Sequence, residues 1–189
     1  MLVEHGFVRA QLPDGREWTF TPSIGRIAEL GTPAGIVELY AALHGPRAPR
    51  LAREVLATLC DQEDATDLIG WLDWDAGTEH DGAMPVAERV VLARHLMQHG
   101  ICGKPDAAKA DDGGSYSSKF DAAQFIAMAR VHLGMTQAEA AALSMTELQQ
   151  LMAVKFPPQD GPKAKNVPSR AEYEAAMKRL TERRKAGAP

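Results

Sequence analysis

A short alternation of apolar and polar residues opens the chain, on either side of a Pro-Asp-Gly turn signal at 13–15. The flanking segments are rich in residues that favour β-strands. Together they predict a β-hairpin over 7–21, with Trp18 and Phe20 on one face. Because an isolated two-stranded hairpin is only marginally stable in water, we expect this one to pack on helices.

After the hairpin, apolar residues recur at helical spacing, and no further strand is expected. A first group of helices is predicted over 24–30, 33–44, 50–60, 65–74 (a short helix or helical turn) and 85–100. A second group is predicted over 121–133, over 137–143 and over a helix through Val154 that either Ser144 or Thr146 caps, followed by a final helix over 170–185. The pattern therefore predicts a mainly α, essentially all-helical protein: an N-terminal β-hairpin, a helical bundle, a second small helical unit and a C-terminal basic helix.

Two stretches without large apolar runs divide these groups. Residues 104–118 are dominated by Gly, Ser, Asp, Ala and Lys, and residues 159–168 are rich in Pro and Lys. Both segments are therefore predicted to be linkers. They predict a hairpin plus helical domain over 1–103, a small helical unit over 119–158 and a basic helix over 169–189.

Composition and charge narrow the class of protein. The 189 residues are 45% hydrophobic, carry two cysteines and contain no apolar run that could span a bilayer, and the first residues lack the pattern of a signal peptide. We therefore expect a soluble cytoplasmic protein without a membrane role.

The net charge of −4 is unevenly distributed along the chain. Residues up to Val154 include 12 basic and 21 acidic side chains, whereas the residues after it include 9 basic and 4 acidic ones. An acidic body of this kind binds duplex nucleic acid poorly.

His95 and His99 stand four residues apart, the spacing of a helical pair of metal ligands, with Cys102 three residues beyond. Spacing identifies no third ligand, and Leu96 occupies the position where a zincin helix carries its general base. A metalloprotein built on these histidines stays an alternative, but we expect no metal and no cofactor.

The segment 73–82 is acidic but lacks the Gly and Glu that a calcium loop requires, so it is interpreted as an acidic turn.

No phosphate loop, dinucleotide fingerprint or nucleophile elbow occurs in the chain, so we expect no enzyme and no catalytic residue. Residues 133–152 open like a helix-turn-helix, which makes a DNA-associated regulator using this segment and the basic tail the alternative function. The second helix of that segment has no basic residue before Lys155, so a nucleic acid partner is unlikely.

Three short motifs, at 120–125, 133–139 and 143–148, together resemble tail assembly chaperones of long-tailed bacteriophages. The resemblance lies in a helix that stops at Leu-Gly, a short helix with a Thr-x-x-Glu start, and a Ser-Met-Thr-Glu-Leu restart. It implies a non-enzymatic chaperone in the host cytoplasm, which binds the tape measure protein and helps to recruit tail tube subunits.

On this interpretation, methionine and other apolar side chains of the short helices form an adaptable contact surface for a partner. The basic tail adds charged contacts, and self-association is left open. The candidate partner-binding residues are Phe125, Met128, Met135, Met145, Leu148, Met152, Lys178, Arg179 and Arg183.

Overall fold

A computed structural model describes residues 6–73, 75–104, 117–157 and 177–178. The chain divides into two compact units, Met1–Phe156 and Pro157–Pro189. In the second unit, the described residues Met177 and Lys178 are helical and exposed. Most of both predicted linkers and most of the predicted basic helix, including Arg179 and Arg183, lie outside the described residues.

The predicted N-terminal hairpin is confirmed. Strand β1 (Val8–Gln11) pairs antiparallel with β2 (Glu17–Phe20), in a register that places Val8 opposite Phe20. Trp18 and Phe20 are 6% and 0% exposed, so the face that carries them packs into the core, as the alternation requires.

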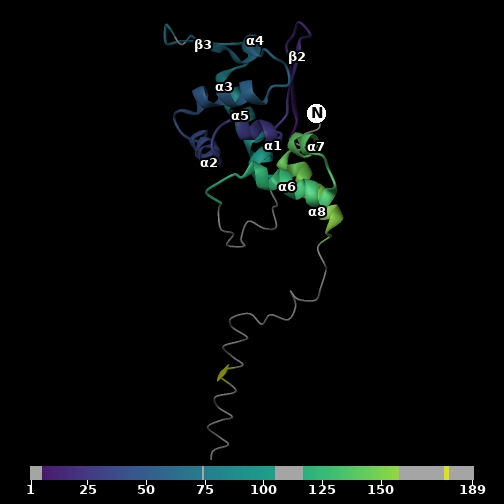
Figure 1. Cartoon of the computed structure of the whole chain (residues 1–189). Helices are drawn as coiled ribbons and strands as arrows, with labels where there is room; N and C mark the ends of the chain where they lie inside the picture. The colour runs from purple at the N-terminus through teal and green to yellow at the C-terminus, as the bar shows by residue number, and fades with distance from the viewer. Residues whose placement is uncertain (1–5, 74, 105–116, 158–176, 179–189) are drawn as a thin grey trace, which may run out of the picture. The chain divides into compact units, whose positions relative to one another are not determined.

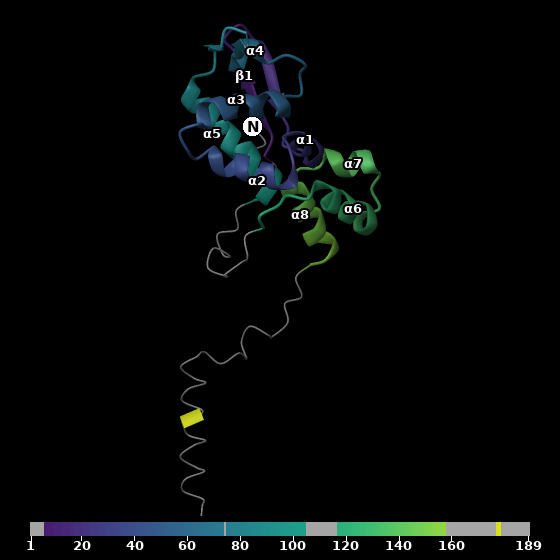
Figure 2. The same cartoon turned by 60° about the vertical axis from the view of Figure 1, so that its left-hand side comes forward.

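Five helices and a π-helical turn make up the first helical group (Figures 1 and 2). Helices α3 and α5 pack side by side, and residues such as Leu56 and Leu96 are completely buried between them and their neighbours. The end of α3 also holds the hairpin, because the amide of Thr21 donates to the carbonyl of Leu59 at 2.9 Å. The elements are α1 (Ile24–Glu29), α2 (Pro33–Ala42), α3 (Ala48–Leu59), α4 (Thr66–Ile69), α5 (Val86–Met97) and the π-helical turn η2 (Gln98–Cys102).

The second helical group comprises α6 (Ala122–Leu133), α7 (Gln137–Ala142) and α8 (Met145–Lys155). These helices pack on α1 and η2, inside the same compact unit as the first group (Figures 1 and 2). The amide of Ile24 donates to the carbonyl of Leu143 at 2.8 Å, which joins the start of α1 to the turn before α8. Of the described helices, none has the length and apolar composition needed to cross a bilayer.

The expectation of a mainly α, all-helical fold is wrong, because a second antiparallel hairpin follows α4. Strand β3 (Trp71–Asp73) pairs with β4 (Thr78–His80), where a helix over 65–74 and an acidic turn were predicted. The fold is mixed α/β. Helix α4 stops at Gly70, whose φ of 78° is in the region that glycine favours. A Cβ at this position would lie 2.1 Å from the carbonyl oxygen of His80, so the close pairing also requires glycine.

Two buried arginines anchor the second hairpin to the helices. Arg89 of α5 is 1% exposed and donates to the carboxylate of Asp81 at 2.6 Å and to the carbonyl of Ile69. Arg53 of α3 is 7% exposed and donates to the same carbonyl at 3.3 Å, while it pairs with Glu79 at 3.3 Å. A buried guanidinium is tolerated only when such acceptors compensate its lost hydration.

Removing the carboxylate of Asp81 should therefore lower the stability of the protein more than is usual for an exposed residue. We expect Asp81→Ala to lower the free energy of unfolding by about 3 kcal/mol, because Arg89 stays buried without its counter-charge. Urea denaturation followed by circular dichroism measures the change. Asp75→Ala, in the exposed turn between β3 and β4, is the matched control and should change stability by less than about 0.5 kcal/mol. Equal losses for both variants would contradict the anchoring role of Arg89.

Candidate functional site

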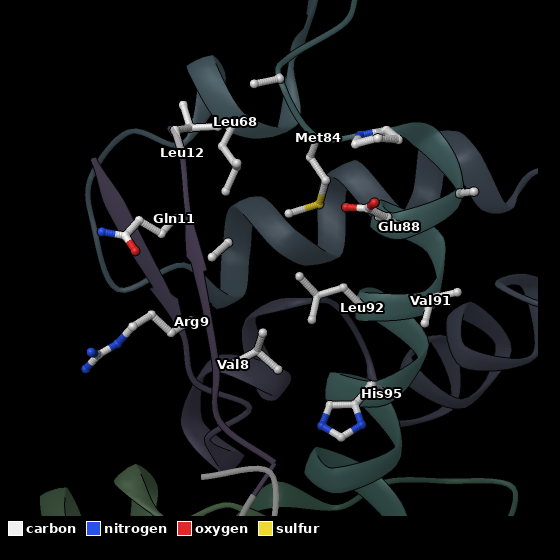
Figure 3. Close-up of a pocket in the computed structure, with 14 residues that line it drawn as sticks. Val8, Arg9, Gln11, Leu12, Leu68, Met84, Glu88, Val91, Leu92 and His95 are labelled. Atoms are coloured by element: carbon white, nitrogen blue, oxygen red, sulfur yellow. The ribbon is translucent and has the colours of Figure 1, made fainter. Parts of the chain in front are cut away.

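An open, mainly apolar groove of about 720 Å³ lies between β1 and α5 (Figure 3), and we refer to it as the β1–α5 groove. Its walls come from β1 and α5, and its floor comes from the end of α4 and the segment that leads into α5. The lining residues are Val8, Arg9, Ala10, Gln11, Leu12, Leu68, Ala83, Met84, Pro85, Ala87, Glu88, Val91, Leu92 and His95.

The strand wall follows from the alternation in β1. Val8, Ala10 and Leu12 are half-buried, and Figure 3 shows Val8 and Leu12 turned toward the groove. Arg9 and Gln11 are exposed, and their side chains point to the other side of the strand. The apolar face of β1 is therefore only partly covered by the rest of the protein.

The helix wall leaves apolar side chains open to solvent. Val91 is 65% exposed and lines the groove, and Leu92 beside it is half-buried. The floor is formed by Leu68 and Met84, which are 3% and 8% exposed. An open apolar groove of this size, with exposed valine at its rim, is typical of a surface that binds another molecule.

Few charged groups line the groove. Arg9 pairs with Glu17 across the hairpin at 3.1 Å, so its charge is compensated within the protein. Glu88, in the first turn of α5, is exposed and has no ion pair with any described residue. The groove therefore offers hydrocarbon walls and one uncompensated carboxylate.

His95 lies at the end of the groove that is nearest η2. Its Nε2 atom is buried and has no hydrogen-bond partner among the described residues, and its ring lies 4.5 Å from that of His99. His99 is 7% exposed, and its Nδ1 atom lies 2.8 Å from the hydroxyl of Thr146 on α8. Within the described part of the chain, no three His, Cys, Asp or Glu side chains gather as metal ligands would.

A second pocket, of about 490 Å³, lies between α3 and residues 62–72. Arg53 lines it: its guanidinium donates to the carbonyl of Ile69 and pairs with Glu79, while its buried Nη1 atom has no hydrogen-bond partner among the described residues. The other charged groups of the pocket have both signs, so it favours no single class of ligand.

The predicted partner-binding residues of α6–α8 fall into two groups. Met145 and Leu148 are 4% and 2% exposed, so they belong to the core and offer no surface to a partner. The other four are half-buried, and apart from Met128 they pack against the core: Phe125, Met128, Met135 and Met152. Lys178 is exposed, while Arg179 and Arg183 lie outside the described residues.

Helix α8 does not present its start to solvent, as the recognition helix of a DNA-binding unit does. Ser144 and Thr146 are 0% exposed, and Thr146 faces His99. Farther along the helix, Gln149 donates to the carbonyl of Cys102 at 2.8 Å. The first turn of α8 is therefore occupied by packing inside the protein.

Two sequence patterns indicate the apolar surfaces that form the β1–α5 groove. The alternation at 8–12 predicts an apolar strand face, and Val86, Val90 and Val91 spread the apolar residues of α5 over more than one side of the helix. A helix that buries one face against α3 and has valine on another face is expected to lie beside a second apolar surface.

A family of unknown function, DUF6246, matches residues 45–175, a range that includes α5 and the floor of the groove but not β1. No curated protein and no solved structure matches the chain.

Burial sets the pH dependence of the histidine pair. Burial lowers the pKa of His95, and burial together with the neighbouring His95 and Lys104 lowers the pKa of His99. Folding therefore disfavours protonation of both rings, whereas in the unfolded chain they take up protons once the pH falls below about 6.5.

We expect the free energy of unfolding to fall as the pH drops from 7.5 to 5.5, because the unfolded state binds the additional protons. Urea denaturation at each pH measures this slope. His95→Gln should flatten it, while His44→Gln, which replaces an exposed histidine, should leave it unchanged. A slope that is the same in both variants would show that the buried pair does not contribute.

Proposed function

We propose a protein-binding function without catalysis for this chain, which belongs to the DUF6246 family of unknown function. The β1–α5 groove would hold an apolar segment of a partner protein. The observation that carries the proposal is the combination of an open groove of about 720 Å³ and a side chain, Val91, that is 65% exposed at its rim.

The lining of the groove suits binding better than chemistry. Its walls are aliphatic, and its described lining residues include no serine, cysteine or threonine nucleophile. His95 and Glu88 are its two acid–base candidates, and they lie seven residues apart on α5, about 10 Å along the helix axis. Apolar walls with few polar groups are what an apolar peptide segment requires.

The resemblance to tail assembly chaperones suggests the partner. A tape measure protein carries long apolar segments, and such segments need protection from water until the tube subunits assemble around them. A groove with apolar walls and one carboxylate could cover part of such a segment. We therefore propose the tape measure protein as the partner, and the tail tube protein as the component recruited next.

No described feature favours the alternative of a DNA-associated regulator. The first turn of α8, which would have to enter the major groove, is buried against the rest of the compact unit. The second helix of the segment also has no basic residue before Lys155 to neutralise phosphate.

Co-expression with a tape measure protein of a long-tailed bacteriophage tests the proposal. We expect the wild-type chain to raise the soluble fraction of the tape measure protein several-fold and to co-purify with it. Val91→Asp should reduce both effects at least about tenfold, because a charge then stands on the apolar wall of the groove.

Val131→Asp is the matched control, since Val131 is a 78% exposed valine on α6 that does not line the groove. It should behave like the wild type. If the wild-type chain neither solubilises nor retains the tape measure protein, the proposed partner is wrong. If the two aspartate variants are equally impaired, the groove is not the binding site.

A further inference from the structure

The outer edge of β1 has backbone groups that the hairpin does not use. The amide of Leu12 donates to the carbonyl of Arg16 at 2.9 Å, so the backbone of Leu12 faces β2. Because successive residues of a strand direct their N–H and C=O groups to opposite sides, the backbone groups of Arg9 and Gln11 face away from β2. We refer to these four groups as the free edge of β1.

The opposite strand gives the same result independently. Thr19 stands opposite Arg9, yet its amide bonds to the side-chain oxygen of Gln62 at 3.0 Å and its carbonyl accepts from the amide of Asp61 at 2.8 Å. Thr19 thus directs its backbone away from β1, so Arg9 and Thr19 form a pair without mutual hydrogen bonds. No described residue bonds to the outward groups of Arg9 and Gln11.

The free edge borders the β1–α5 groove, because Arg9 and Gln11 are both among its lining residues. The hairpin places its apolar face over the helices, with Trp18 and Phe20 of β2 buried and Val8 and Leu12 of β1 half covered. A third strand beside β1 would extend this sheet over α5. Its inward side chains would then fill the groove, and its outward side chains would face water.

Charge restricts what can bind there. Among the described lining residues, Glu88 is the carboxylate without an ion pair. A second copy of the chain would bring its own Glu88 to the contact. Charge complementarity therefore favours a different protein with a basic residue in the bound segment.

We infer that the β1–α5 groove binds an extended segment of a partner protein as a third strand beside β1. Alternate apolar side chains of that segment would lie in the groove, and one lysine or arginine would pair with Glu88. The inference rests on the proposed function, because it specifies how the same groove holds its partner.

Synthetic peptides test the backbone pairing directly. The probe is a fluorescent peptide in which valine alternates with threonine and one threonine is replaced by lysine, with binding to the full-length chain followed by fluorescence anisotropy. Two further versions carry N-methyl groups on one or the other set of alternate amides. Only the set that bonds to β1 should matter, so one version should lose at least about tenfold in affinity while the other binds normally. Equal binding of both methylated versions, or no binding of the parent peptide at millimolar concentration, would overturn the inference.

A substitution in the chain tests the same bonds from the other side. Gln11→Pro removes one outward N–H, while the bonds between β1 and β2 remain, because proline is tolerated on the outer side of an edge strand. It should weaken peptide binding about tenfold, whereas Gln11→Thr, which keeps the N–H, should not. Unchanged far-ultraviolet circular dichroism confirms that both variants are folded. Equal affinities for the two variants would contradict strand addition.

The charge pair is tested by reversal. Glu88→Lys should weaken the lysine peptide about tenfold and strengthen a peptide with glutamate at that position, while Glu29→Lys on α1, outside the groove, should change neither. If Glu88→Lys binds both peptides as the wild type does, Glu88 does not select the partner.

Analytical ultracentrifugation tests whether a second copy of the chain occupies the groove. If the wild type forms a dimer that Gln11→Pro abolishes, the occupant is a second copy and the inference is wrong.

These results separate the two proposals. Retention of the tape measure protein that depends on Val91 but is unaffected by Gln11→Pro would refute strand addition and leave the proposed function standing. Peptide binding with the expected methylation pattern, without any retention of the tape measure protein, would refute the proposed partner and support strand addition.

Discussion

The buried guanidinium of Arg89 ties together the segments on which the rest of the structure depends. It lies on α5 and donates both to the carboxylate of Asp81, beyond the second hairpin, and to the carbonyl of Ile69 at the end of α4. A charge that is 1% exposed must keep these acceptors, since losing them would leave it uncompensated. The floor of the β1–α5 groove, Leu68 and Met84, is next to these contacts, and the amide of Met84 donates to the carbonyl of Leu68 at 2.8 Å. The pairing of one arginine therefore positions both the helix wall and the floor of the groove.

Features set by local chemistry could be read from the sequence. The turn signal at 13–15 and the alternation around it predicted the first hairpin, because register and turn are determined within a few residues. The start of α7 was also predicted: Thr136 and Glu139 form a capping box, in which each side chain satisfies a backbone amide at the helix start. Burial of Trp18 and Phe20 followed from the same period of two.

Features set by distant contacts could not be read in this way. The second hairpin has strands of three residues, and it depends on Arg53 and Arg89, which reach it from α3 and α5. Likewise, the apolar stripe of α8 could be recognised from its spacing, but spacing does not tell which element covers it. Met145 and Leu148 turned out to face the core, while an open apolar groove lies between β1 and α5.

The two walls of the groove lie far apart in the chain, with α1 to α4 and the second hairpin between them. During synthesis the first hairpin leaves the ribosome well before α5 does, so the outer edge of β1 is exposed in the nascent chain before its groove exists. Arg9 and Gln11, the polar residues of that edge, then discourage premature pairing with other strands. The order of synthesis thus separates the time at which the edge of β1 exists from the time at which the β1–α5 groove is complete.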